Sequence, residues 1–200
     1  ARVRGITGVM ARQNSARNPK STSRTASPVL IGVALVTAFT ALAASIKGQI
    51  NDVFTVQFKG DYAVTTDNQF TGGISPSLAL DLNSLPEVEK ASGIGLITVK
   101  LNDKGQYFTT IDPGTVEGVF DIGLINATYS DLSADSIFLS ESYSIRKNLP
   151  MGSTVNATLG DATQRELTVR GLYEFDELAG NFVVNRAMIA KSSVVNFDIG

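Results

Sequence analysis

The longest hydrophobic feature of the chain is an uncharged run near its N-terminus, residues 28–46, with the sequence PVLIGVALVTAFTALAASI. As a helix, these 19 residues have a length of about 28 Å, close to the thickness of a bilayer's hydrocarbon core. Arg24 and Lys47 flank the run, where their charges can reach the headgroups. Pro28 suits the first turn of a helix, where its missing N–H is not needed. The pattern therefore predicts a transmembrane helix over residues 28–47.

Two other interpretations of this run stay open. One is a buried helix of a soluble protein, although such helices are usually amphipathic and this run has no polar face. The other is a cleaved signal peptide, because Ala41-Leu42-Ala43 resembles a cleavage site after an apolar stretch. The 27 residues before the run are long for the charged part of a signal peptide, which favours the transmembrane helix.

From residue 53 onward the pattern changes to short runs of alternating polarity separated by turn residues, which is typical of β-strands. The runs predict strands at residues 53–58, 62–66, 95–101, 106–111, 136–139, 153–159, 165–173 and 181–185, with a hairpin across residues 102–105. Ser75 and Pro76 begin a predicted helix that ends at Asn83, and Ser140 caps a second one that ends near Lys147. These elements predict an α+β domain.

Charge is distributed unevenly along the chain. Residues 1–27 contain no acidic residue and six basic ones: Arg2, Arg4, Arg12, Arg17, Lys20 and Arg24. The other 11 of the 17 basic residues and all 19 acidic residues follow residue 46. The positive-inside rule therefore places residues 1–27 in the cytoplasm and the domain outside it. Basic residues directly before a membrane span also argue against nucleic-acid binding.

Two further patterns concern the membrane segment. Ile6, Val9 and Met10 recur at helical spacing and predict a short interfacial helix. Small residues then share one face of the transmembrane helix at spacings i, i+4, i+7 and i+11, whereas larger side chains cover the opposite side; these small residues are Ala34, Ala38, Ala41 and Ser45. Because small residues let membrane helices approach closely, we expect this face to pack against other transmembrane helices.

The composition excludes several kinds of enzyme chemistry. Without histidine and cysteine, the chain cannot form a Ser-His-Asp triad, a histidine-ligated zinc site or a disulfide. It also lacks the GxxxxGK[ST] phosphate-binding loop. The remaining candidates for acid–base catalysis are Glu141, Glu174, Asp176 and Glu177, and solvated loop or helix-end charges are the simpler interpretation. We expect no catalytic, cofactor-binding or metal-binding residues.

Residues 11–19 have the pattern ARxNxxRNP, followed by Thr22, Thr25 and the apolar run. With its surroundings, residues 4–46, this stretch resembles the lead-in to a transmembrane helix of FtsX/MacB-like ABC transporter permeases, and most closely the actinobacterial type. We expect six of its residues to anchor the segment at the membrane interface: Arg12, Arg17, Asn18, Pro19, Lys20 and Arg24.

Further landmarks follow in the domain. They are LPEV at residues 85–88, the segment 132–159, and LTVRGLY at residues 167–173 followed by FVVN at residues 182–185. In this order they resemble the periplasmic core domain of MacB-type permeases. The resemblance implies a mixed sheet with short helices. It also implies a separate ABC ATPase subunit and motion passed through the membrane helices to this domain.

The sequence thus predicts the permease subunit of an FtsX/MacB-like ABC transporter in the bacterial cytoplasmic membrane. Its parts are a basic cytoplasmic segment (1–27), a transmembrane helix (28–47) and an extracytoplasmic domain (48–200). Its expected partners are the ATPase, further transmembrane helices, a second permease copy and membrane lipid. A single-pass anchored binding or adhesion domain is the alternative, and an anchored hydrolase, weakened by the missing histidine, is the third. Since the chain does not begin with Met, we expect a fragment or a processed product.

The charge distribution gives a topology that can be tested by cysteine labelling, because the chain has no native cysteine. On intact cells, a membrane-impermeant maleimide should label Ser130→Cys and leave Ser15→Cys unlabelled, since the basic segment holds the N-terminus inside. Labelling of Ser15→Cys but not of Ser130→Cys would overturn this orientation.

Overall fold

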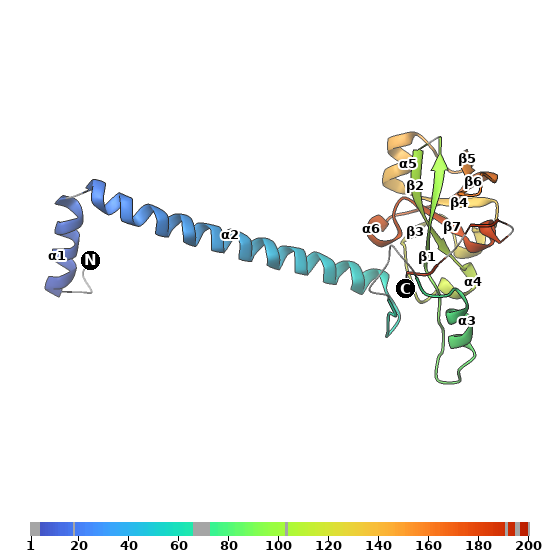
Figure 1. Ribbon diagram of the computed structural model, residues 1–200, viewed down its shortest axis with the longest axis horizontal. Helices are drawn as coiled ribbons and strands as arrows, with labels where there is room; N and C mark the ends of the chain where they lie inside the picture. The colour runs from blue at the N-terminus through green and yellow to red at the C-terminus, as the bar shows by residue number, and fades with distance from the viewer. Residues whose placement is uncertain are drawn as a thin grey trace. The chain divides into compact units, whose positions relative to one another are not determined.

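The computed structural model describes residues 5–17, 19–65, 73–102, 104–190, 192–194 and 197–199 (Figure 1). The chain divides into two units, residues 1–51 and residues 52–200. The first is helical, with α1 (Gly5–Arg17) followed by α2 (Pro19–Gln57). The 39 residues of α2 correspond to a helix of about 58 Å, and the last of them belong to the second unit.

The segment Ala26–Gly48 of α2 is long and apolar enough to cross a membrane, and it is the one such stretch among the residues that the structure describes. None of its 23 side chains is buried. A core helix of a soluble protein would have its apolar side chains covered. The exposed apolar helix is therefore compatible with a membrane protein.

α2 is longer at both ends than the hydrophobic pattern predicts. Residues 19–27, which precede the predicted transmembrane helix, are helical as well, and Pro28 lies inside the helix rather than in its first turn. Residues 53–57 belong to the same helix, so the predicted strand at residues 53–58 is wrong. β-branched and aromatic residues favour strands only weakly, and extending an existing helix does not repeat the cost of nucleating one.

Seven strands form one sheet in the second unit. They are β1 (Gly95–Leu101), β2 (Lys104–Ile111), β3 (Leu124–Ile125), β4 (Ser136–Ser140), β5 (Thr154–Thr158), β6 (Gln164–Tyr173) and β7 (Phe182–Asn185). Their order is β3-β6-β4-β7-β2-β1-β5, and β5 also pairs with β6, so the sheet closes on itself. The β2–β7 and β4–β6 pairs are parallel and the others are antiparallel, which makes the sheet mixed.

The closure depends on β6. Its first half pairs with β5 and its last two residues pair with β3, while β4 runs along its other edge. The register against β4 shifts between Val169 and Gly171, which leaves Arg170 as the extra residue of a β-bulge. Because side chains alternate along a strand, the bulge reverses which residues face inward. Val169 therefore packs in one hydrophobic core and Tyr173 in another.

The two faces of the sheet carry these two cores. The inner core consists of alternate side chains from all strands except β3, together with residues of the 3-10 helix η2 (Arg186–Ile189). The outer core lies on the other face, where the segment 116–132 packs against Phe138, Tyr173 and Val183. β4 contributes to both cores, and all five of its residues are consequently buried.

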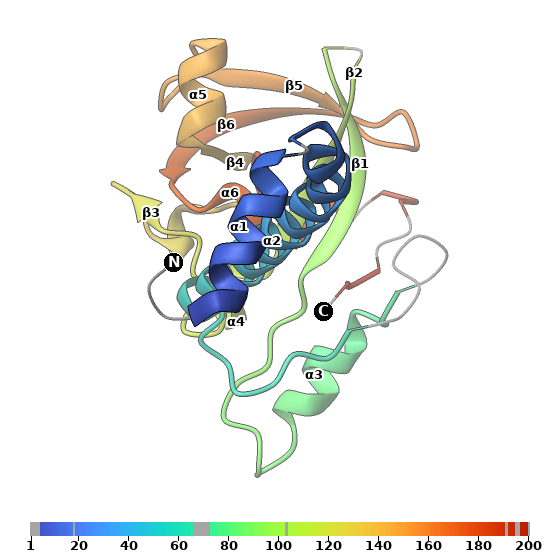
Figure 2. The same ribbon diagram turned by 90° about the vertical axis from the view of Figure 1, so that its left-hand side faces the viewer.

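Besides η2, the described residues of the second unit form five short helices: α3 (Ser77–Asn83), α4 (Pro113–Val116), η1 (Tyr129–Asp131), α5 (Glu141–Lys147) and α6 (Asp176–Ala179). α5 shows local signals at both ends. The Ser140 side chain accepts a hydrogen bond from the Tyr143 N–H, and Asn148 ends the helix in the left-handed conformation. α5 contacts β4 and β6, and its axis runs across β6 (Figure 2). The Tyr143 ring meets the Phe182 ring edge-on at 4.7 Å between centroids.

A mixed sheet with short helices, preceded by an apolar helix, is confirmed. The hairpin of β1 and β2 is also confirmed, with a tighter turn because Lys104 already pairs with Leu101. The predicted strand at residues 62–66 is wrong over residues 62–65, which have no regular structure, and residue 66 lies outside the described residues. α3 has Pro76 rather than Ser75 at its N-cap. The two residues of β3 are too few to give a predictive pattern.

The bulge in β6 leads to a stability prediction. A Cβ at Gly171 would lie 2.8 Å from both Ala127 Cβ and Phe138 Cδ1. Gly171→Ala should therefore lower the free energy of unfolding of the unit 52–200 by about 1–3 kcal/mol, as overpacked cores do. Gly160→Ala is the control, because a Cβ there meets no atom within 4 Å. Urea denaturation measures both, and equal midpoints for the two variants would contradict the close packing at the bulge.

Candidate functional site

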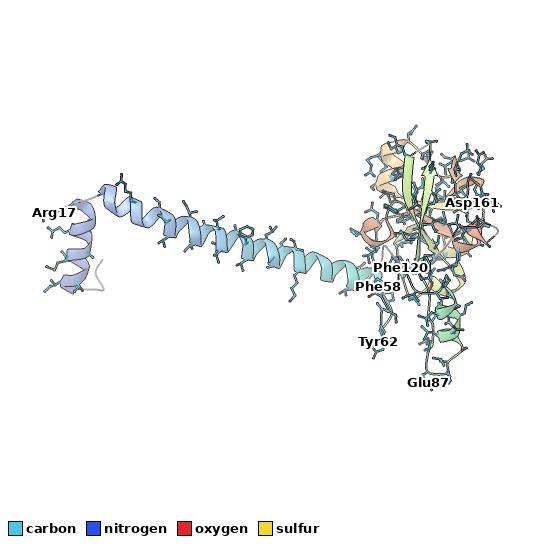
Figure 3. The ribbon with its side chains drawn as sticks, viewed as in Figure 1. Arg17, Phe58, Tyr62, Glu87, Phe120 and Asp161 are labelled. Carbon is cyan, nitrogen blue, oxygen red and sulfur yellow. The ribbon has the colours of Figure 1, made fainter. Side chains whose placement is uncertain are left out.

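The six predicted anchor residues lie on the two helices of the first unit or between them. Arg12 and Arg17 belong to α1 and Arg24 to α2, and all three side chains are exposed. Figure 3 shows Arg17 on α1. Arg17 occupies the last turn of α1, where a positive charge interacts favourably with the helix dipole. Pro19 and Lys20 form the start of α2, and Asn18 lies outside the described residues. The basic charges are thus free to meet an anionic surface.

The predicted packing face lies within the apolar segment of α2. At 100° per residue, the spacing of Ala34, Ala38, Ala41 and Ser45 keeps them within an arc of about 60°. All four are exposed. The large side chains Leu35, Phe39 and Leu42 are more than half exposed as well. An apolar helix exposed on all sides is unfavourable in water, so this segment needs lipid or other helices around it.

Two threonines of the segment are satisfied within the helix. The Thr37 hydroxyl donates to the Val33 carbonyl, and the Thr40 hydroxyl donates to the Val36 carbonyl at 2.7 Å. Such bonds satisfy these two hydroxyls within the helix, so neither requires an outside partner in an apolar medium. The two threonine side chains therefore suit a hydrocarbon environment.

The end of α2 is held by contacts within the second unit. Gln57 is 1% exposed, and its Nε2 donates to Glu177 Oε2 at 3.0 Å. The Gln57 carbonyl accepts from the Asp121 N–H at 2.7 Å. The Phe58 and Phe120 rings lie side by side with centroids 5.5 Å apart (Figure 3). Sequence reasoning misses this junction because it expects a strand at these residues, and a lone glutamine carries no signal of burial.

The candidate acid–base residues are spread over two short helices and a turn. Glu141 is exposed in the first turn of α5, and Glu174 is exposed directly after β6. Asp176 and Glu177 begin α6, where Asp176 Oδ2 accepts from the Ser142 hydroxyl at 2.8 Å and Glu177 accepts from Gln57. Acids in a first turn stabilise a helix. The carboxylates of Asp176 and Glu177 thus form hydrogen bonds within the fold. No three Asp or Glu side chains within the described ranges form a metal-ligand group.

The residues with shifted pKa values also form hydrogen bonds within the fold. Burial raises the pKa of Tyr129 to about 12, and its hydroxyl donates to the Phe120 carbonyl at 2.7 Å. Burial also raises the pKa of Tyr173, whose hydroxyl donates to the Gly180 carbonyl at 2.6 Å. Hydrogen bonds from Thr128 lower the pKa of Asp131. Among the described residues, none of these three groups lines the cavity beside α3.

A cavity of about 240 Å³ lies between α3 and the strand ends, lined by residues that include Leu80, Asp112 and Arg186. The Arg186 guanidinium donates to the Gly93 carbonyl at 2.8 Å and forms an ion pair with buried Asp198 at 2.7 Å. A Cβ at Gly93 would lie 2.0 Å from Asp198 Oδ2, so only glycine fits there. The charges beside this cavity thus hold the C-terminal segment in place.

No protein-family model matches the chain. No curated protein matches it either. Among solved structures it is similar to a domain described as part of a permease protein from Porphyromonas gingivalis, with 17% identity and a TM-score of 0.42. The match covers 57% of this chain and 58% of that one. A likeness this distant assigns neither fold nor function, so the functional conclusion rests on the chain itself.

Asp161 gives a prediction about pH. Hydrogen bonds from Thr163 and then from Ser193 lower the pKa of this carboxyl below its ordinary 3.8. Because the folded-state pKa is depressed, the contribution to stability is present above pH 3.8 and is lost as the pH falls through the folded-state pKa. In an NMR titration, the amide shifts of Thr163 and Ser193 should move with a midpoint below 3.8.

The matched variant for this titration is Asp161→Asn, in which the carboxyl is absent and both amides should show no such step. The Gly152 amide, which donates to the Val169 carbonyl at 2.8 Å, serves as an internal reference. A midpoint above the ordinary value for an aspartate would contradict the prediction.

Proposed function

We propose that this chain is part of the permease subunit of an FtsX/MacB-like ABC transporter. In this proposal it couples a separate ATPase to an extracytoplasmic domain, for export or for mechanotransmission. The observation that carries the proposal is the apolar segment Ala26–Gly48, of which no residue is buried and which follows a basic stretch and continues as one helix to Gln57. A domain with a mixed sheet follows it, as the resemblance of the sequence to MacB-type permeases implies.

Orientation and partners follow from the same features. The basic residues before the apolar segment favour a cytoplasmic N-terminus in the bacterial cytoplasmic membrane, with the residues from about 48 onward outside. The small face around Ala38 supports packing against the remaining transmembrane helices and a second permease copy. Membrane lipid covers the rest of the segment. Arg12, Arg17 and Arg24 would anchor it at the interface.

ATP hydrolysis is assigned in this proposal to another chain. A phosphate-binding loop, histidine and cysteine are absent from the sequence. The carboxylates Asp176 and Glu177 are engaged with Ser142 and Gln57. The domain would therefore act by binding and moving rather than by catalysis. ATP binding to the partner must then favour one arrangement of the membrane helices over another.

Co-purification from native membranes tests the proposal. The full-length protein that contains this chain, carrying an affinity tag, should recover an ABC-type ATP-binding subunit. Ala38→Leu should reduce that recovery by about tenfold, equivalent to about 1.4 kcal/mol, because added bulk separates closely packed helices. Phe39→Leu is the control, because residue 39 lies off the small face and the substitution adds no bulk.

Two results would contradict the permease assignment. One is recovery of the full-length protein without any ATP-binding subunit, together with equal tolerance of Ala38→Leu and Phe39→Leu. That outcome supports a single-pass anchored binding or adhesion domain. The other is hydrolase turnover by the domain that a single carboxylate substitution abolishes.

A further inference from the structure

Gln57, the last residue of α2, combines burial with incomplete hydrogen bonding. Its Nε2 donates to Glu177 Oε2 at 3.0 Å. Its Oε1 is buried and has no hydrogen-bond partner among the residues that the structure describes. Buried polar atoms are nearly always paired, and an unpaired acceptor destabilises the arrangement that contains it. The contact that fixes the end of α2 is therefore weaker than its burial alone suggests.

The amide cannot remove this defect by turning over. In the reversed orientation Oε1 would face the Glu177 carboxylate, and an ionised carboxylate only accepts hydrogen bonds. The bond from Nε2 would be lost and two acceptors would face each other. Glu177 consequently fixes the amide in the orientation that leaves Oε1 unpaired.

The backbone beside Gln57 is fully engaged, in contrast to its side chain. The Gln57 carbonyl accepts from the Asp121 N–H at 2.7 Å, and the Lys59 N–H donates to the Val119 carbonyl at 2.9 Å. Between them, Phe58 forms an isolated antiparallel bridge with Phe120, and their rings are in contact. Residues 57–59 are thus paired with residues 119–121 over a short distance.

We propose that Gln57 is a positioning residue, and that residues 57–59, residues 119–121 and Glu177 form a releasable latch between the end of α2 and the domain. On release, Oε1 becomes hydrated, and this hydration offsets part of the free energy of the lost contacts. The free-energy difference between the latched and released states is therefore small. A movement of α2 can then shift the population between them. The inference rests on the proposed function, in which such a movement would come from the transmembrane helices.

Two substitutions separate a latch from ordinary packing, because they act in opposite directions. Gln57→Met keeps the length of the side chain and removes both Nε2 and Oε1. Glu177 is exposed and exchanges the lost hydrogen bond for water, so no buried polar group stays unpaired and the latch should hold closed more firmly. Glu177→Ala removes the carboxylate that accepts the hydrogen bond from Gln57 Nε2, so it should favour release. The substituted residue itself is exposed. Glu177→Gln retains an acceptor for Nε2 and adds an N–H that can donate to Oε1, so exchange should not accelerate as it does in Glu177→Ala.

Hydrogen exchange of the full chain in lipid nanodiscs measures the latch through the amides of Lys59 and Asp121, which both donate across it. Exchange should slow by about fivefold in Gln57→Met and accelerate by about fivefold in Glu177→Ala, the factors expected for one hydrogen bond. Rates are taken relative to the Gly152 amide, which donates to the Val169 carbonyl. A general loss of stability in a variant therefore cancels.

Opposite changes in the two variants support the latch. Acceleration in both would make Gln57 an ordinary buried contact, and unchanged exchange in either would remove its assigned role; both results overturn the inference. The measurement requires neither ATP nor a partner subunit. Absence of an ATPase partner would therefore defeat the proposed function while leaving this result intact.

Discussion

The fold depends on one irregularity in β6, the bulge at Arg170. Nine of the ten residues of β6 pair with three other strands, so this strand both closes the sheet and holds β3 at its edge. Without the extra residue, Tyr173 would face the inner core together with Val169. With it, Tyr173 supports the outer core, and the segment that contains Phe120 packs there. The surface that receives Phe58 thus exists because the strand changes face part-way along its length.

A second constraint acts on α2, since backbone groups in hydrocarbon must be bonded within the helix. The Thr37 and Thr40 hydroxyls bond to carbonyls of the preceding turn and add no unmet donor. Pro28 removes one N–H, but it lies near the end of the apolar segment, next to Arg24 and the basic stretch. Beyond Gly48 the helix continues for nine residues to Gln57. The chain therefore reaches the domain with its backbone hydrogen bonds still internal.

Most elements of the domain could be predicted because their signals are local. Alternation gives β1 and β6, the turn residues between 101 and 106 give the hairpin with β2, and the Ser140 cap gives α5. The elements that could not be predicted depend on distant residues. The pairing of β5 with both β1 and β6 is a matter of register between separate strands. Gln57 is buried because of Glu177, 120 residues away, and the same residues 53–57 have the composition of a strand. At residues 53–57, extension of the helix that precedes them overrides the weak local preference for a strand.

The unpaired buried atoms show how Gln57 differs from the Arg186–Asp198 ion pair. Arg186 Nη1 and Asp198 Oδ1 also lack hydrogen bonds within the described residues, yet their charges attract each other across 2.7 Å from Nη2 to Oδ1. That attraction offsets incomplete geometry, because it acts without a linear hydrogen bond. Gln57 is neutral, so its Oε1 has no such compensation. A group of this kind persists only where the surrounding contacts hold it, and at Gln57 those contacts are two backbone hydrogen bonds, one aromatic pair and one carboxylate. The latch proposed above rests on this lack of compensation at Gln57.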